Sequence, residues 1–303
     1  MLEILPLLVF TTCGGIAAGA YVVSAFAGLC VPGSMLDAMK SKSSAQNDGG
    51  KTGDAQSKKA EGAEEAHAMT EGNALSAAEK FNLNRTWLFP LVCIALLGIG
   101  LLGTLMHLGQ PLRFINGMAN PASMISQESY WAIAFGVLMV VDFLLAKTKG
   151  QPLMVIRWLA AIAACGLMFV TGFAYFDCYF IAPWSDAITI PLFIVGDLAM
   201  GAGLCLLFAD HKERSILHIL NVAICAAWLA VACAYAVFGA DLGMQVGVIV
   251  AGVIIGAIGS AIVSIAHIQG KLSEQNAAIA VLVCAVVGVV LVRGVFFAAG
   301  VIG

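Results

Sequence analysis

The chain has 303 residues, of which 61% are hydrophobic and only 11% are charged, and its formal net charge is −3. Soluble domains carry roughly 25% charged residues, so this composition excludes an ordinary soluble domain, and the slightly acidic balance argues against a nucleic-acid partner. Only continuous apolar helices or closed barrels satisfy backbone groups in lipid, and the long unbroken apolar runs favour helices. We therefore predict an all-α, polytopic membrane protein.

Eight apolar segments are long enough, at about 20 residues each, to cross a bilayer as a bundle of helices. The predicted spans are 5–30, 87–107, 130–146, 153–176, 188–208, 215–238, 243–267 and 277–300. The chain starts MLEILPLLVF, with Glu3 where a cleavable signal peptide carries a basic residue, and its apolar run exceeds a signal-peptide core. We interpret this segment as a retained first span of a single transmembrane domain, residues 1–303.

The predicted orientation follows from the basic residues. The links after the first, third, fifth and seventh spans hold all 15 basic residues except Arg113 and Arg293. Because cytoplasmic links carry the excess of Lys and Arg, both termini are expected outside. The first of these links, residues 32–80, is rich in Ser, Gly, Ala, Lys and Glu and is predicted to be a largely disordered cytoplasmic loop.

The link TLMHLGQPLRFINGMANPASMISQESYW between the second and third spans is expected on the outer face. His107 should lie in the last turn of the second span, since Gly109 is well placed to end that helix and Pro111 prevents an immediate restart. Ser126 is a plausible cap for the third span and Glu128 falls in its first turn. A histidine and a carboxylate at helix ends are often only interfacial residues, so position alone does not define a site.

Arg293 lies deep in the last span, within VVLVRGVFFAAGV. An arginine near the centre of a membrane helix costs roughly 2.5–3.5 kcal/mol on insertion scales, so we expect a counter-charge. The acidic residues placed toward the outer side are Glu3, Glu128, Asp177, Asp186 and Asp241. We predict a buried outer-side network that includes Arg293 and Glu128.

A base and a carboxylate at a membrane surface suit the oxidation of a quinol. This reaction removes two protons from two hydroxyl groups, and the site must supply proton acceptors. Histidine accepts a proton near neutral pH, and a partly desolvated glutamate can be tuned to do the same. The ring needs an apolar slot between helices, which the span ends provide. We therefore predict that His107 and Glu128 are the catalytic residues.

Three motifs resemble the DmsC family, the membrane anchor subunits of bacterial dimethyl sulfoxide reductase. The first motif is HLG-x-P-x-R, followed by an Asn and by Ser-x-Glu at the start of the next span. Its residues here are His107, Leu108, Gly109, Pro111, Arg113, Asn116, Ser126 and Glu128. The opening EILPLLVFTTCGG resembles the start of the family, and RGVFF resembles its closing GRGVFY with Val292 in place of glycine. The first cytoplasmic link is longer than the family leads one to expect.

The resemblance implies an anchor in the cytoplasmic membrane that serves anaerobic respiration. It implies two partners on the outer face, a four-cluster ferredoxin-like iron–sulfur subunit and a molybdopterin catalytic subunit. Menaquinol would be oxidised near His107 and Glu128, and its electrons would pass to the nearest iron–sulfur cluster of the partner. The expected cofactor-binding residues are His107, Gly109, Pro111, Arg113, Glu128 and Arg293. Arg113 would shape the link or meet a partner.

The chain itself is expected to hold no metal, haem or iron–sulfur cluster. Its nine cysteines include no C-x-x-C pair and mostly lie in apolar runs, which is typical of small buried residues. A stacked pair of b-haems needs four ligands spread over both halves of the membrane, and the five histidines are not distributed in that way. One haem between His218 and His267 stays open as an alternative.

Three other functions remain open at this stage. A quinone-reducing anchor of an oxidising molybdoenzyme would use the same residues in the opposite direction, and a passive anchor would use none of them. A small-solute transporter would also have eight apolar spans. Transporters place polar groups near the midplane, where Asp142 and Asp197 are the candidates, but no internal symmetry is evident.

Overall fold

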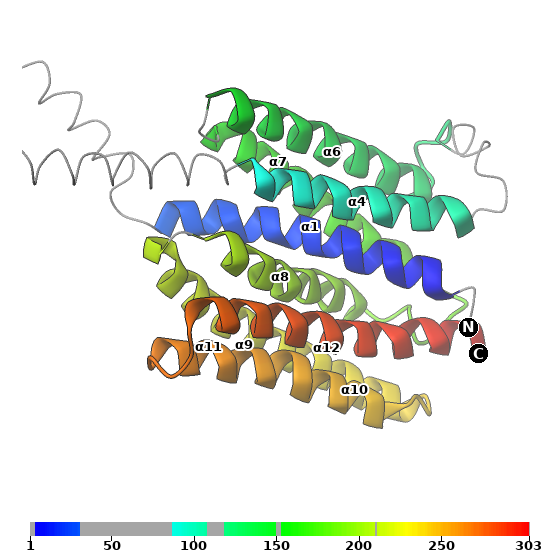
Figure 1. Ribbon diagram of the computed structural model, residues 1–303. Coiled ribbons are helices and arrows are strands. Elements are labelled where there is room, and N and C mark those ends of the chain that lie inside the picture. Colours follow the sequence, from blue (N-terminus) through cyan, green and yellow to red (C-terminus); the bar gives the residue numbers. More distant parts are fainter. Residues whose placement is uncertain (1–3, 31–86, 108–117, 150–152, 210, 303) are drawn as a thin grey trace, which may run out of the picture.

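The computed structural model describes residues 4–30, 87–107, 118–149, 153–209 and 211–302 (Figure 1). All regular structure within these ranges is helical. The predicted loop 32–80 lies outside them, as do Gly109, Pro111 and Arg113. His107 is described as part of a helix, but its side chain is not.

Within the described residues, eight helical segments are long and apolar enough to cross a membrane, which confirms the predicted all-α bundle of eight spans. Seven of them are single helices: α1 (Ile4–Cys30), α4 (Leu88–His107), α6 (Met124–Lys149), α7 (Met154–Phe176), α8 (Thr189–Phe208), α9 (His211–Asp241) and α12 (Glu274–Ile302). The seventh span in chain order consists of α10 (Val246–Val253), a π-helical turn η2 (Ile254–Gly259) and α11 (Ser260–Ile268).

The start of α1 and the end of α12 lie at the same end of the bundle, here called the terminus end (Figure 1). The opposite, distal end holds basic residues from four elements. Lys147 and Lys149 lie in the last turn of α6, Arg157 in the first turn of α7, Arg214 near the start of α9, and Lys271 between α11 and α12. The bundle therefore has the asymmetry of charge on which the predicted orientation depends.

Helix α1 runs through the middle of the bundle, against α4, α7, α8 and α12 (Figure 1). Glycines bring it close to α8. A Cβ atom at Gly19 would overlap the backbone of Asp197, and a Cβ atom at Gly201 would overlap the backbone of Gly19. Small residues allow such close approach between membrane helices. This packing places Asp197 directly against α1.

The third span begins earlier than predicted. Helix α6 starts at Met124, so Ser126 lies buried inside the helix and the prediction that it caps the helix is wrong. The residue before the helix is Ser123, whose carbonyl accepts the amide of Gln127 at 3.0 Å. The polar residues of SMISQES lower the local hydropathy, but they form regular helical turns, and Glu128 therefore lies one turn inside α6.

Candidate functional site

Glu128 is fixed by a contact between neighbouring antiparallel helices. Its side chain is partly buried on α6, and its Oε1 accepts a hydrogen bond from Thr171 Oγ1 of α7 at 2.6 Å. Thr171 is itself buried near the end of α7 that faces the terminus end. A hydroxyl that donates to a carboxylate favours its charged form, while burial favours its neutral form. Glu128 is therefore a carboxyl group with opposing influences on its proton.

A cavity of about 110 Å³ lies beside Glu128, between α1, α4 and α6. Its apolar lining comes from Phe10, Leu101, Leu105, Ile125, Ala132 and Ile133. Thr104, Glu128 and Ser129 supply its polar atoms. Because Ile125 and Ile133 line this cavity and are also exposed on the bundle surface, the cavity lies next to the lipid-facing side of α6.

The described part of helix α4 extends to His107, and the prediction that Gly109 ends this helix lies outside the described residues. Thr104 and Leu105, which belong to the last turn of α4, line the cavity. The structure thus brings the end of α4 to the same cavity as Glu128. The contact between the imidazole of His107 and the quinol stays a prediction, as do the roles of Gly109, Pro111 and Arg113.

Arg293 is buried and has a counter-charge, as expected, but this is Asp197, which was not among the acids predicted for the outer-side network. Its Nη2 lies 2.6 Å from Asp197 Oδ1 and also donates to the carbonyl of Phe193 at 3.2 Å. Its Nη1 donates to the carbonyl of Thr11 at 2.6 Å, and its guanidinium lies over the Phe193 ring at 4.6 Å. Arg293 does not line the Glu128 cavity, and its role in cofactor binding stays a prediction.

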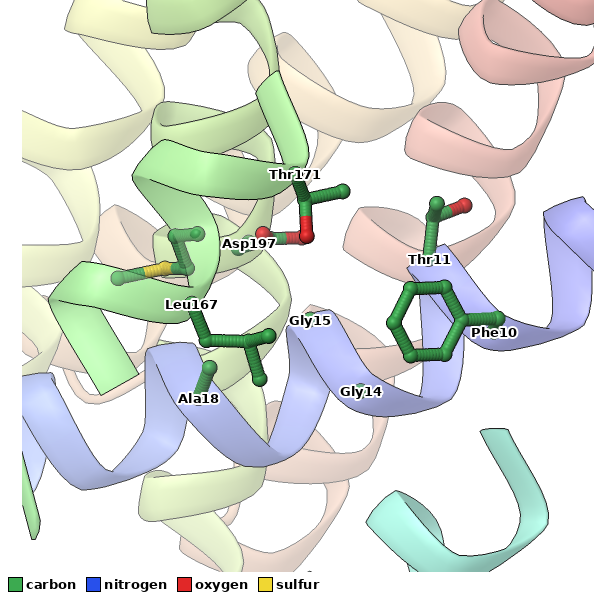
Figure 2. A pocket seen from close by; sticks show the side chains of 9 residues that line it. Phe10, Thr11, Gly14, Gly15, Ala18, Leu167, Thr171 and Asp197 are labelled. Atoms are coloured by element: carbon green, nitrogen blue, oxygen red, sulfur yellow. The ribbon is translucent and has the colours of Figure 1, made fainter. Parts of the chain in front are cut away.

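A second cavity, of only about 10 Å³, lies between α1, α7 and α8 (Figure 2). Thr171 and Asp197 both line it, and the close-up shows their oxygen atoms above the glycines of α1. Thr171 also binds Glu128, and Asp197 also binds Arg293. Glu128 and Arg293 are therefore connected only indirectly. Sequence reasoning missed Thr171 entirely and treated Asp197 only as a candidate for transport.

The other candidate for transport, Asp142, lies in the distal half of the bundle. The hydroxyl of Tyr21 donates to Asp142 Oδ2 at 3.1 Å, and Arg157 Nε lies 3.5 Å from the same oxygen. Both aspartates considered for a transport path therefore have an arginine neighbour. Paired carboxylates of this kind are typical of buried polar contacts in a bundle and give no specific support to transport.

His218 and His267 lie together in the distal half, with ring centroids 4.3 Å apart. Nδ1 of His218 is 3.0 Å from Ser264 Oγ. Rings at this separation leave no room for a porphyrin between them, so the geometry gives no support to a haem held by this pair. Among the residues that the structure describes, no group of three or more His, Cys, Asp or Glu side chains is placed to hold a metal ion.

Comparison with known proteins gives one match. The family model of the DMSO reductase anchor subunit (DmsC) matches residues 74–292, which run from before α4 to the residue preceding Arg293. No match was found among curated proteins or among solved structures. The matched region covers most of the chain and includes Glu128 and Thr171. Eight membrane-spanning segments agree with an anchor, and the chain belongs to the DMSO reductase anchor subunit (DmsC) family.

Proposed function

We propose that the protein is the membrane anchor and the menaquinol-oxidising subunit of a dimethyl sulfoxide reductase-type molybdoenzyme. Membership of the anchor family supports the first part. The observation that carries the second part is the cavity beside Glu128, where a carboxylate held by Thr171 borders a largely apolar space. Sites for small aromatic molecules combine an apolar lining with a few placed polar groups in this way.

The place of the cavity suits a ring that arrives from lipid. Its volume of about 110 Å³ is below the roughly 150 Å³ of an apolar cavity that binds benzene, so a two-ring headgroup would enter it in part and extend toward the lipid-facing side of α6. Exposed Ile125 and Ile133 form part of its wall, so a quinol dissolved in the bilayer can approach along α6. The apolar lining excludes water from the ring and leaves Glu128 as the acidic group within reach.

The proposed chemistry separates protons from electrons. Oxidation of the quinol releases two protons and two electrons. Glu128 accepts one proton, and His107 accepts the other from its position at the end of α4, three residues after Thr104. The electrons pass to the iron–sulfur subunit and from there to the molybdopterin subunit. The same site would work in reverse in a quinone-reducing enzyme, and the potential of the partner's substrate sets the direction.

The distribution of charge supports an orientation in which the terminus end faces outward from the cytoplasmic membrane. The basic residues of the described loops and helix ends gather at the distal end, and cytoplasmic ends of membrane proteins carry such excess. In this orientation the Glu128 cavity lies toward the face on which the two partner subunits would dock. Protons from the quinol would then be released on the outer side.

Replacement of Glu128 by Gln tests the proposal. The amide keeps the size of the side chain and can still accept the Thr171 hydroxyl, but it cannot take a proton. We expect quinol oxidation by the assembled complex to fall about 10²-fold, in line with the loss of a general base. His107→Ala should have a similar effect.

Glu274→Gln is the matched control, because it makes the same chemical change at the distal end of α12. It should leave the rate of quinol oxidation unchanged. Co-purification of the partner subunits shows that each variant assembles. A Glu128→Gln complex that assembles and oxidises quinol at the wild-type rate would refute the proposed site.

A further inference from the structure

A chain of polar groups leads inward from Glu128. Thr171 donates to Glu128 on one side and lines the small cavity on the other. Asp197 lines the same cavity (Figure 2) and accepts a hydrogen bond from Arg293. Glu128 and Arg293 are thus separated by one hydroxyl, one small cavity and one carboxylate.

The small cavity has the size and the polar lining that one water molecule needs. A volume of about 10 Å³ is close to the 10–15 Å³ that holds a single water, provided that two or more polar partners surround it. Thr171 and Asp197 supply two such partners. Arg293 contacts Oδ1 of Asp197, and a carboxylate with one such contact keeps further acceptor positions for a donor inside the cavity.

Glycines keep the polar groups of this cavity against the backbone of α1. A Cβ atom at Gly15 would overlap Oδ1 of Asp197, and Gly14 also lines the cavity. An apolar pair of similar volume is often equally or more stabilising than a buried ion pair such as Asp197 and Arg293. The presence of two buried charges here is therefore not explained by stability alone.

The directions of the hydrogen bonds indicate how the ion pair can act on Glu128. A guanidinium beside Asp197 holds it as a carboxylate, which can only accept hydrogen bonds. A water in the cavity must then donate to Asp197, and it can donate its second hydrogen to Thr171 Oγ1. Thr171 in turn directs its own hydrogen to Glu128, as observed. Because the Thr171 hydroxyl accepts a hydrogen bond from the water, it becomes a stronger donor to Glu128.

We propose that one water molecule binds in the cavity between Thr171 and Asp197, and that Arg293, Asp197, this water and Thr171 together hold Glu128 as the proton-accepting carboxylate. Asp197, Arg293 and Thr171 are positioning residues, since they act through Glu128 and do not touch the quinol. The inference rests on the proposed function of Glu128. It assigns the buried ion pair a part in setting the charge of the site.

The test is the pH profile of quinol oxidation by the whole complex. Thr171→Val removes the hydroxyl but keeps the shape of the side chain. Without this donor the carboxylate of Glu128 takes up a solution proton at higher pH, so the acid limb of the profile should move upward by about one pH unit, the equivalent of about 1.4 kcal/mol. Thr171→Ser should restore the wild-type profile.

A shift of the pH profile can be assigned to Glu128 only if the variant leaves the other titratable groups near it unchanged. Among the described side chains, the titratable or charged groups around it are Tyr175 on α7, Asp197 on α8 and Arg293 on α12, and the proposed site adds His107. Thr171→Val alters none of them. Thr12→Val is the matched control, because Thr12 is a buried threonine whose hydroxyl has no partner among the described residues. Its profile should match that of the wild type.

The outcomes separate this inference from the proposed function. If Glu128→Gln abolishes quinol oxidation but Thr171→Val leaves the acid limb in place, the water-linked chain is refuted and the quinol site stands. If Glu128→Gln oxidises quinol normally, the proposed function itself fails. Should the Thr171→Val complex not assemble, Thr171→Ala removes the same hydroxyl without adding bulk, and it carries the same expected shift.

Discussion

Two buried aspartates have an arginine neighbour, one in each half of the bundle, and the two pairs differ in completeness. In the terminus half, Asp197 lies 2.6 Å from Arg293, whose side chain is only 2% exposed and also donates to two backbone carbonyls. In the distal half, Asp142 lies 3.5 Å from Arg157, whose side chain is 21% exposed. Oδ1 of Asp142 has no hydrogen-bond partner among the described residues.

The difference follows from where each arginine enters the bundle. Arg157 lies in the first turn of α7, from which a long side chain can reach the membrane surface, whereas Arg293 lies well inside α12. A cation that cannot reach water must have its donors satisfied by the protein. Both pairs join an aspartate to an arginine, so the identity of the partners does not explain the difference. The depth of the arginine in the membrane explains how short the contact is and how many of its donors are bonded.

The largest effect should follow from breaking the deep pair. Asp197→Leu leaves Arg293 buried without a counter-charge, and we expect a loss of about 3–5 kcal/mol in the free energy of unfolding. The double variant Asp197→Leu, Arg293→Met removes both charges and should recover most of this loss. Thermal unfolding of the complex in detergent measures both. Equal midpoints for the single and double variants would contradict the idea that the unpaired charge is the cause.

A smaller effect should follow from crowding the deep pair. In Gly15→Ala the added methyl group would overlap Asp197 Oδ1, so the carboxylate or helix α1 must shift. Overpacking of this kind costs about 2 kcal/mol. Gly98→Ala on α4 is the control, because a Cβ atom there meets no atom within 4 Å. The prediction fails if the two variants unfold at the same temperature.

The smallest effect should follow from weakening the shallow pair. Tyr21→Phe removes the hydroxyl that donates to Asp142 but keeps the ring packed against Phe135. We expect a loss of about 1.5 kcal/mol, the value of one hydrogen bond to a charged group. Thermal unfolding again provides the measurement. If Tyr21→Phe lowered the free energy of unfolding as much as Asp197→Leu does, the shallow pair would depend on its hydrogen bonds as strongly as the deep pair, and the comparison would fail.

The spans could be predicted from the sequence, because crossing lipid requires about 20 apolar residues whatever the helix packs against. The start of α6 could not be predicted, because polar residues such as Ser126 lower the hydropathy of a segment even when they are buried inside a helix. The rotation of each helix about its own axis could not be predicted from the sequence either. Helices such as α1 and α8 are apolar on all sides, so periodicity does not tell which face meets which neighbour.

The same limit explains what was found and missed at the site. The motif around Glu128 indicated its importance, but its partner Thr171 is 43 residues away and belongs to no motif. Asp197 and Arg293 are 96 residues apart. One signal could have joined them, since each lies at a similar distance from the terminus end of its own helix. Matched depth of an aspartate and an arginine in two apolar helices would have favoured this pair over Glu128.

The contacts of Arg293 also set an order for building the protein. Its guanidinium joins the carbonyl of Thr11 in α1 to Asp197 in α8, and it is delivered by α12, which is synthesised after both. Until α12 leaves the ribosome and enters the bilayer, Asp197 has been inserted without its cation. Insertion of α12 therefore completes the contacts between α1, α8 and α12. A nascent chain that stops short of α12 leaves an unmatched acid in the membrane, the kind of defect by which a protease can tell an unfinished membrane protein from a finished one.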